Sequence, residues 1–319
     1  MKFYSSVIEG NNSNQFELFK AVEKMLDLKV PPKLASHDCA TDLANRFADF
    51  FTAKVQAIRN GFVTSVNTAD HQESTALIDP GCKLHSFTPT SADELTTLLA
   101  KAWGKSCMLD PLPGKLMKDC SDTLLPVIVG TVNLSFDEAV VPAKFKQGAL
   151  PPKLKKPSLD NELFPNFRPI TNLRFISKVT EKVVAARLNS YLDDNNLHEL
   201  LQSAYKQGHS TETTLVKVQN DILRSIDEHN CVALLLLDLS AAFDTVDHSL
   251  LLSRLRHRFQ IDGKALKWLH SYLTNRSQFV CVGNGYSSRR DLLYGVPQGS
   301  VLGPILYFSI IYCTPCRCY

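Results

Sequence analysis

Two short stretches carry side chains whose types and spacing could do chemistry. The first, LLLLDLSAAFDTVDH, spans residues 234–248 and places Asp238 directly after four leucines. This run of apolar residues predicts a buried strand over residues 231–237. A charged carboxylate at the end of a buried strand lowers the stability of the fold unless it is paired, hydrogen-bonded or bound to a metal. A divalent cation such as Mg²⁺ would suit Asp238, with the Leu239 carbonyl as a further oxygen ligand. An aspartate that only caps the following turn is the alternative.

The second stretch, GVPQGSVLGPIL, spans residues 295–306. It places a turn with Pro297 and two glycines before an apolar helix that is predicted to begin near Ser300. Glycine in such a turn lets the backbone lie close to a flat ligand such as a base or a sugar. Taken alone, the stretch indicates no more than the start of a helix.

Helices and one hairpin are predicted to position these stretches, which makes the chain an α+β protein. SADE at residues 91–94 is typical of a capping box, with Ser91 as N-cap and Glu94 reaching back, and opens a helix to about Trp103. A hairpin is predicted around residues 283–285. Apolar spacing predicts further helices over residues 43–55, 124–136, 175–192, 215–226, 249–259 and 264–273.

Composition is ordinary, but charge is unevenly spread. Hydrophobic residues make up 44% and charged residues 21% of the 319 residues, which is typical of a globular protein and names no function. The net charge is +3, yet residues 144–187 hold ten basic and three acidic side chains. This basic block favours a polyanion such as nucleic acid, or else a solvated surface. We expect an intracellular protein, in the cytoplasm or nucleus, that is neither secreted nor inserted in a membrane.

Taken together and in this order, the two stretches resemble the reverse transcriptase domain of non-LTR (LINE-type) retrotransposons. LDLSAAFDTVDH (237–248) is similar to motif A of that family, and GVPQGSVLGPIL (295–306) to its motif B. Upstream, LKKPSLDNELFPNFRPITNLRFISKVTEKVVAARL and QSAYKQGHSTETTLVKV resemble its fingers segments. Residues 43–59 resemble the connector between endonuclease and polymerase. Several long motifs in register are more specific than one signature.

The resemblance implies a right-hand polymerase fold, with an antiparallel palm sheet and helices. Residues 1–88 would be a helical connector, residues 89–230 the fingers with the basic block, and residues 231–319 a partial palm with motifs A and B. The implied reaction is DNA synthesis directed by an RNA template, on a DNA primer, from deoxynucleotide triphosphates. The resemblance implies no oligomeric state.

The resemblance also implies roles for single residues. Asp238 would be a catalytic ligand of two metal ions, Mg²⁺ or Mn²⁺, together with the Leu239 carbonyl. Phe243 would be a steric gate against a ribose 2′-hydroxyl. Asp244 and Asp247 would be structural or capping groups. The remaining roles are nucleotide binding by Arg168, Ala241, Ala242, Gln298 and Gly299, and nucleic-acid binding by Lys178, Lys182 and Lys206.

The sequence departs from the family pattern in one respect that bears on activity. The second carboxylate source, a Y/F-x-D-D hairpin called motif C, is expected some tens of residues after motif B, and the sequence ends at Tyr319. We therefore expect a reverse transcriptase truncated before motif C, with weak metal binding and no activity by itself. Tyr191–Asp194 spells Y-x-D-D but precedes motif A, and is interpreted as a helix end. The alternatives are a non-catalytic RNA- or DNA-binding fragment that uses the basic block, and an unstable relic.

Overall fold

The computed structural model describes residues 34–65, 83–100, 107–199, 201–206 and 208–311. Helices and strands are mixed along the chain, which confirms the α+β class. The chain divides into two compact units, one formed by Met1–Asp38 and Pro152–Arg168, and the other by Cys39–Pro151 and Pro169–Tyr319. The predicted functional boundaries near residues 88 and 230 stay predictions.

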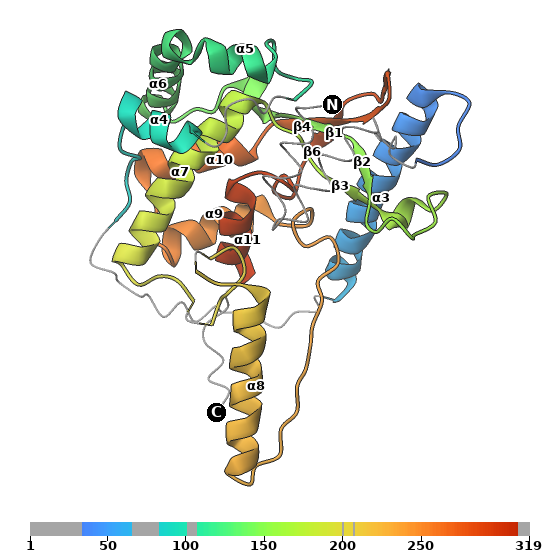
Figure 1. The fold of residues 1–319 in the computed structure, drawn as a ribbon, viewed down its shortest axis with the longest axis vertical. Helices are drawn as coiled ribbons and strands as arrows, with labels where there is room; N and C mark the ends of the chain where they lie inside the picture. The colour runs from blue at the N-terminus through green and yellow to red at the C-terminus, as the bar shows by residue number, and fades with distance from the viewer. Residues whose placement is uncertain (1–33, 66–82, 101–106, 200, 207, 312–319) are drawn as a thin grey trace, which may run out of the picture. The chain divides into compact units, whose positions relative to one another are not determined.

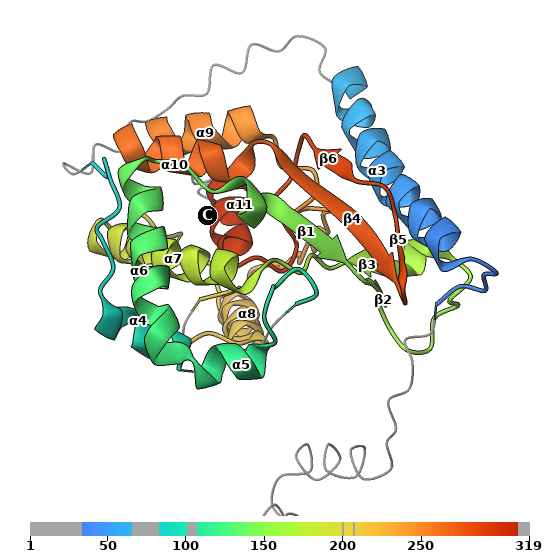
Figure 2. The ribbon, with the colours of Figure 1, turned by 90° about the horizontal axis from the view of Figure 1, so that it is seen from above.

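A helical core dominates the larger unit, where α7 crosses the other helices (Figures 1 and 2). Its residues form one hydrophobic cluster that includes Trp268, which is 1% exposed and stacks on Tyr272 with ring centroids 5.7 Å apart. Aromatic and aliphatic burial of this extent is the main source of stability in such a unit. The helices are α4 (Ala92–Leu99), α5 (Gly114–Asp119), α6 (Ser121–Asp137), α7 (Phe175–Asp194), α9 (His248–His257), α10 (Gly263–Leu273) and α11 (Leu302–Ile311).

The start of α4 follows its predicted capping signal. Ser91 caps α4 as predicted, since its hydroxyl accepts a hydrogen bond from the amide of Glu94 at 3.2 Å. The Glu94 carboxylate accepts two hydrogen bonds from Arg187, and a backbone hydrogen bond from Ser91, as the capping box predicts, helps to lower its pKa. A guanidinium offers two charge-assisted bonds where a backbone amide offers one. The predicted end at Trp103 lies outside the described residues.

One four-stranded sheet borders the helical core. Strand β4 (Arg276–Val282) is its centre and pairs in parallel with β1 (Gln147–Leu150) and antiparallel with β5 (Gly285–Tyr286) and β6 (Arg290–Leu292). The predicted hairpin is therefore confirmed, with Gly283 at a φ of +53° in its turn. Helix α3 (Ala40–Ser65), the helix predicted from residues 43–55, packs on β4 and β5.

The smaller unit is built around a two-stranded sheet. Strands β2 (Pro152–Leu154) and β3 (Phe167–Pro169) pair, and the Lys155 amide donates to the Asn166 carbonyl at 2.8 Å. Ser36 also belongs to this unit, and its backbone amide and hydroxyl donate hydrogen bonds to the Glu162 carboxylate. Short 3₁₀ turns cover residues Ala143–Lys146 and Phe164–Asn166.

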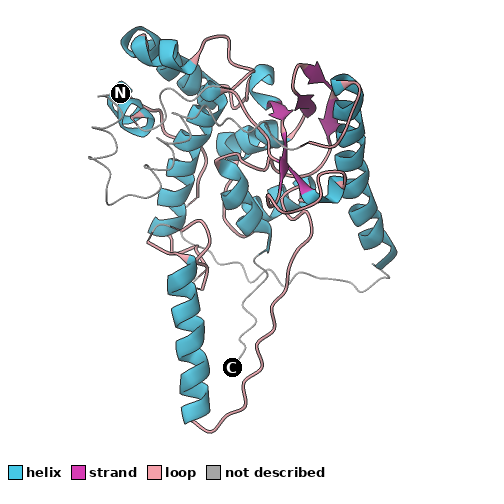
Figure 3. Cartoon of the chain, turned by 45° about the vertical axis from the view of Figure 1, so that its right-hand side comes forward, coloured by secondary structure: helices cyan, strands magenta, loops and turns pink. Residues whose placement is uncertain are grey.

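The predicted strand at residues 231–237 is absent, and this corrects the first expectation above. Residues 231–239 form no strand and are exposed, with Leu236 and Leu237 each 82% exposed. They return along an arm whose other half is α8 (Thr211–Asp227), and α8 buries no residue (Figure 3). A buried strand needs neighbours on both edges to pair its amides and carbonyls. Within the described ranges, no strand pairs with residues 231–237.

Among the described residues, no helix is both long and apolar enough to span a lipid bilayer.

Candidate functional site

Motif A and motif B lie against each other in the larger unit. The Val296 amide donates to the Phe243 carbonyl at 2.8 Å, and the Gly295 amide donates to the Val246 carbonyl at the same distance. Gly295 has a φ of +86°, and a Cβ there would lie 2.7 Å from the Asp244 carbonyl oxygen. Only glycine permits so close an approach at that φ. Two segments about fifty residues apart thus meet at one place, as a shared nucleotide site requires.

Phe243 and Asp238 both lie near the helix that follows motif B. The Phe243 ring is half-buried, with its centroid 4.7 Å from that of Tyr307 on α11. Burial raises the pKa of Tyr307, and the negative charge of Asp238 raises it further. Asp238 is therefore close to this aromatic pair, although it is exposed and not buried as expected. Leu239 is 59% exposed.

The turn after Asp238 is tight, as the small residues predict. Ala241 has a φ of +50°, a left-handed conformation that is uncommon for residues other than glycine. Its carbonyl accepts hydrogen bonds from the amides of Asp244 at 2.9 Å and Thr245 at 3.2 Å. These bonds hold the backbone of Ala241 and Ala242 in a fixed curve beside Phe243. Strained backbone of this kind is often found at ligand sites.

Asp244 and Asp247 behave as different kinds of carboxylate. Asp247 is the N-cap of α9 and accepts bonds from the amides of Ser249 and Leu250, as the capping interpretation predicts. Burial opposes its charge, but these groups and Arg59, at 2.8 Å, outweigh burial and lower its pKa to about 2. Burial raises the pKa of Asp244 to about 6, against the attraction of Lys54.

Motif B also forms a hydrogen bond with the segment that follows β3. The Gln298 carbonyl accepts a hydrogen bond from the Thr171 amide at 2.8 Å. The side-chain oxygen Oε1 of Gln298 is buried and has no hydrogen-bond partner among the described residues. Gly299 is exposed, has a φ of +102°, and lies against Thr171. A buried acceptor without a donor is costly and is typical of a place where a ligand or water supplies the missing bond.

A buried carboxylate that the sequence analysis missed anchors the start of α11. Glu181 on α7 is 1% exposed, and its Oε2 accepts from the Val301 amide at 2.6 Å and the Leu302 amide at 3.4 Å. The Tyr272 hydroxyl donates to Oε1 at 3.1 Å. Burial raises the pKa of Glu181, whereas Arg276 favours the charged form. The only sequence signal was an acidic residue inside an apolar helical stripe.

Arg276 supplies the positive charge near Glu181. Its side chain is 1% exposed, lies over the Tyr272 ring at 4.7 Å, and donates from Nη1 to the Tyr272 carbonyl at 2.9 Å. His248 forms a second side-chain hydrogen bond with motif B, because its Nε2 lies 2.7 Å from the Gly295 carbonyl oxygen. Burial lowers the pKa of His248. Glu181 and His248 therefore hold motif B, and the buried Arg276 supplies a positive charge beside Glu181.

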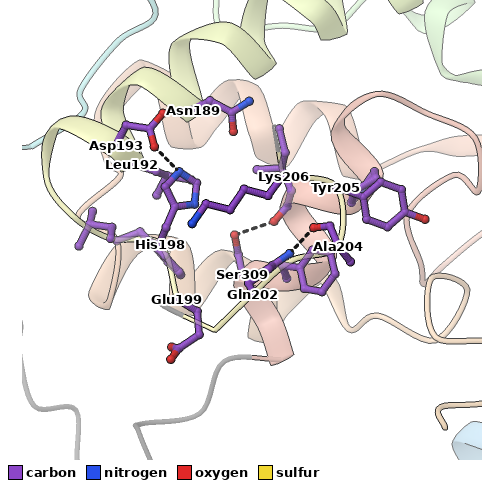
Figure 4. A pocket seen from close by; sticks show the side chains of 15 residues that line it. Asn189, Leu192, Asp193, His198, Glu199, Gln202, Ala204, Tyr205, Lys206 and Ser309 are labelled. Carbon is purple, nitrogen blue, oxygen red and sulfur yellow. Dashed lines mark hydrogen bonds and ion pairs between the residues drawn. The ribbon is translucent and has the colours of Figure 1, made fainter. Parts of the chain in front are cut away.

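The residues predicted to contact nucleic acid lie on different elements. Arg168 is exposed on β3, in the smaller unit. Lys178 is half-buried on α7, whereas Lys182 donates to the Leu98 carbonyl at 3.4 Å, near the end of α4. Lys206 lines a pocket beside α11 (Figure 4).

Asp238 and the Leu239 carbonyl do not supply enough ligands by themselves to bind a divalent metal ion. Asp238 and the Leu239 carbonyl are exposed and contribute one carboxylate and one carbonyl oxygen. In the part of the chain that the structure describes, no group of three or more histidine, cysteine, aspartate or glutamate residues could hold a metal ion. A hard cation held with substrate phosphates commonly takes one or two carboxylates, and a two-metal site needs more than one.

Motifs A and B thus lie together on a scaffold of mixed helices and strands. The family model described as reverse transcriptase (RNA-dependent DNA polymerase) matches residues 154–315. The chain therefore belongs to the reverse transcriptase family, and its relatives place it with the polymerases of non-LTR retrotransposons.

Three relatives come from Drosophila melanogaster. The chain is 34% identical over 175 residues to the probable RNA-directed DNA polymerase from transposon BS. This match covers 55% of this chain and 19% of the relative. It is 28% identical over 271 residues to that from transposon X-element, covering 84% and 29%. It is 31% identical over 142 residues to the RNA-directed DNA polymerase from mobile element jockey, covering 44% and 15%. The chain thus spans less than a third of these relatives.

Proposed function

We propose that the chain is the fingers and the first part of the palm of an RNA-directed DNA polymerase that copies an RNA template onto a DNA primer. The observation that carries this proposal is the hydrogen bond from Val296 to Phe243, because it joins motif A to motif B at one site. The family match and the names of the relatives support the same reaction. Deoxynucleotide triphosphates are the proposed substrates.

Three residues are proposed to select the nucleotide. The Phe243 ring, fixed against Tyr307, would collide with a ribose 2′-hydroxyl and so favour deoxyribose. Gln298 would use its unpaired Oε1 to accept a hydrogen bond from the nucleotide or the template. Gly299, which lacks a side chain and is exposed, would let the base lie close to the backbone.

Mg²⁺ or Mn²⁺ is the proposed cofactor, and Asp238 with the Leu239 carbonyl would be this segment's contribution to its site. These two groups do not make a metal site by themselves. We expect the 319 residues alone to bind primer and template without measurable extension.

The basic block offers less support for a purely nucleic-acid-binding role. Arg187 pairs with Glu94, Arg174 donates to the Lys144 carbonyl, and Lys182 donates to the Leu98 carbonyl. Lys146 is 8% exposed and donates to the Ser271 hydroxyl. Four of the block's cations therefore contact the protein itself, so fewer remain for phosphates.

Primer extension by a chimera tests the proposal. The segment of the transposon BS polymerase that matches this chain is replaced by this chain, and template binding like that of the parent enzyme shows that the chimera is folded. We expect extension on an RNA template, its loss with Asp238→Asn, and increased ribonucleotide incorporation with Phe243→Ala.

The matched control is Asp221→Asn, which removes an exposed carboxylate of α8 that pairs with Lys217. It should leave extension unchanged. Extension that survives Asp238→Asn in a folded chimera would contradict the proposed role of motif A.

A further inference from the structure

Helix α3 is anchored to the sheet by the apolar side chains of its first half. The helix packs on β4 and β5 (Figure 2). Burial of apolar surface is the main force that holds such a helix in place. The family model begins at residue 154, so α3 lies outside the segment that it matches. The anchoring side chains, each at most 5% exposed, are Leu43, Ala44, Phe47, Ala48 and Phe51.

The second half of α3 carries Arg59, whose guanidinium contacts both conserved-motif regions of the site. Its Nη1 donates to the Thr245 carbonyl at 3.1 Å, and its Nη2 donates to the Asp247 carboxylate at 2.8 Å. Both acceptors belong to motif A. The guanidinium carbon also lies 3.5 Å from the centroid of the Tyr294 ring, and Tyr294 directly precedes motif B. One planar group therefore bridges the two motifs.

These contacts lie next to a hydrogen bond that joins motif A to motif B. The Gly295 amide donates to the Val246 carbonyl at 2.8 Å. Thr245 precedes Val246 in the chain, and Tyr294 precedes Gly295. Arg59 therefore contacts the residue before each partner of this bond. A guanidinium suits such a place, because its donors are fixed in one plane and its face stacks on an aromatic ring.

A second arginine also joins α3 to its unit but touches neither motif. The Nη2 of Arg290, on β6, lies 2.6 Å from the Asp49 carboxylate of α3. This pair is more exposed, with side chains 33% and 65% exposed, than the pair of Arg59 and Asp247, at 21% and 31%. Arg290 therefore offers a matched comparison for Arg59.

We propose that Arg59 is a positioning residue for the nucleotide site, because it keeps motif A in register with motif B and so holds the Phe243 ring in place. The inference rests on the proposed function, since this register matters to a site that both motifs form. Arg59 acts through the two motifs and not on the nucleotide itself. Without its guanidinium the junction loosens, and the Phe243 ring rejects a ribose 2′-hydroxyl less strictly.

Hydrogen exchange of the full chain tests the bridge itself. Arg59→Met keeps a long side chain but removes the guanidinium. It should speed exchange of the Gly295 and Val296 amides by about 10- to 150-fold, the factor for losing a hydrogen bond from a charged donor. The Val301 amide, which bonds to Glu181, should exchange as before. Arg59→Lys keeps the charge without the planar fork, so it should restore only part of the protection.

The matched control is Arg290→Met, the same substitution in the other arginine that pairs with α3 or with its contacts. It should leave exchange of the Gly295 amide unchanged. Tyr294→Phe keeps the ring and should also leave it unchanged, whereas Tyr294→Leu removes the ring and should speed exchange. Added to Arg59→Met, Tyr294→Leu should have little further effect, because both substitutions remove the same contact.

Primer extension by the chimera described above tests the consequence for the site. Arg59→Met should lower the ratio of kcat/KM for deoxyribonucleotides to that for ribonucleotides by about 10-fold or more, since a misplacement of about 1 Å can cost about 100-fold. A smaller amount of folded enzyme would lower both rates equally and leave their ratio unchanged. The ratio therefore separates positioning from folding.

Unchanged exchange of the Gly295 and Val296 amides in a folded Arg59→Met chain would overturn the proposal, whatever the chimera does. Faster exchange with an unchanged ratio in an active chimera would also overturn it. An unmodified chimera that does not extend primers would instead contradict the proposed function, and hydrogen exchange would still decide whether Arg59 bridges the motifs. The two failures are therefore distinguishable.

Discussion

Motif B and the leucine run before motif A differ sharply, although the leucine run was the one expected to be a buried strand. Motif B begins a helix whose first amides bond to Glu181, and Leu302 is 0% exposed. The leucine run, residues 234–237, has side chains that are 59–82% exposed and pairs with no strand in the described ranges. The amides of motif B bond to Glu181 of α7 and to the carbonyls of Phe243 and Val246 within its own unit. The leucine run lacks such neighbours, and its composition alone does not bury it.

The largest expected effect comes from breaking the anchor of motif B. Glu181→Ala leaves Arg276 buried without its countercharge and frees the Val301 amide, so it should lower the free energy of unfolding by about 3–5 kcal/mol. Urea denaturation followed by circular dichroism measures this. Glu181→Gln keeps an acceptor oxygen and should cost less. Equal stability of the alanine variant and the unmodified chain would show that Glu181 does not anchor motif B.

A single type of substitution compares the two regions directly. Leu302→Ala removes a fully buried side chain and should cost about 2–5 kcal/mol. Leu236→Ala removes an exposed one and should change the free energy of unfolding by less than about 0.5 kcal/mol. The same denaturation experiment measures both, and a similar loss in both variants would mean that the leucine run is buried in solution.

The two carboxylates after Phe243 should give opposite pH dependences. Asp244 has a folded pKa of about 6 against 3.8 ordinarily, so its contribution favours folding at acid pH and is lost as pH rises from about 4 to 6. Asp247 has a folded pKa of about 2, so its contribution is present above about pH 4 and is lost as pH falls toward 2.

Unfolding measured across this pH range sharpens the comparison. Asp244→Asn should remove the decrease in the free energy of unfolding between pH 4 and 6, a decrease of about 1–3 kcal/mol. Asp247→Asn should weaken the cap of α9 and so lower the free energy of unfolding by about 0.5–2 kcal/mol at neutral pH. It should also make that free energy depend less on pH below about 4. A parallel shift of the whole profile in either variant would contradict the assigned titration.

Local signals accounted for much of the fold, and long-range pairing did not. Apolar periodicity predicted α6 and α7, and glycine with asparagine predicted the β4–β5 turn, because each depends on residues close in sequence. The partners of Glu181 are Tyr272 and Val301, about a hundred residues away. No pattern in the sequence pairs them. The leucine run was mispredicted for the same reason, since a strand is defined by its neighbours.

The site was predictable in part. The resemblance selected Phe243 in motif A and Gln298 in motif B, two segments that the structure joins by hydrogen bonds, and Asp247 caps α9 as the capping interpretation predicts. It did not separate Lys182, which contacts the Leu98 carbonyl, from Lys206, which lies in a cavity. Whether a surface lysine contacts protein or solvent depends on packing that spacing does not encode.

Hydrogen exchange of individual amides tests the central contrast most directly. The Val296 amide, bonded to the Phe243 carbonyl, and the Val301 amide, bonded to Glu181, should exchange slowly, with protection near that of the core. The amides of residues 234–237 should exchange at nearly unprotected rates. Slow exchange in both segments would contradict the account, because it would mean that the leucine run is paired and buried in solution.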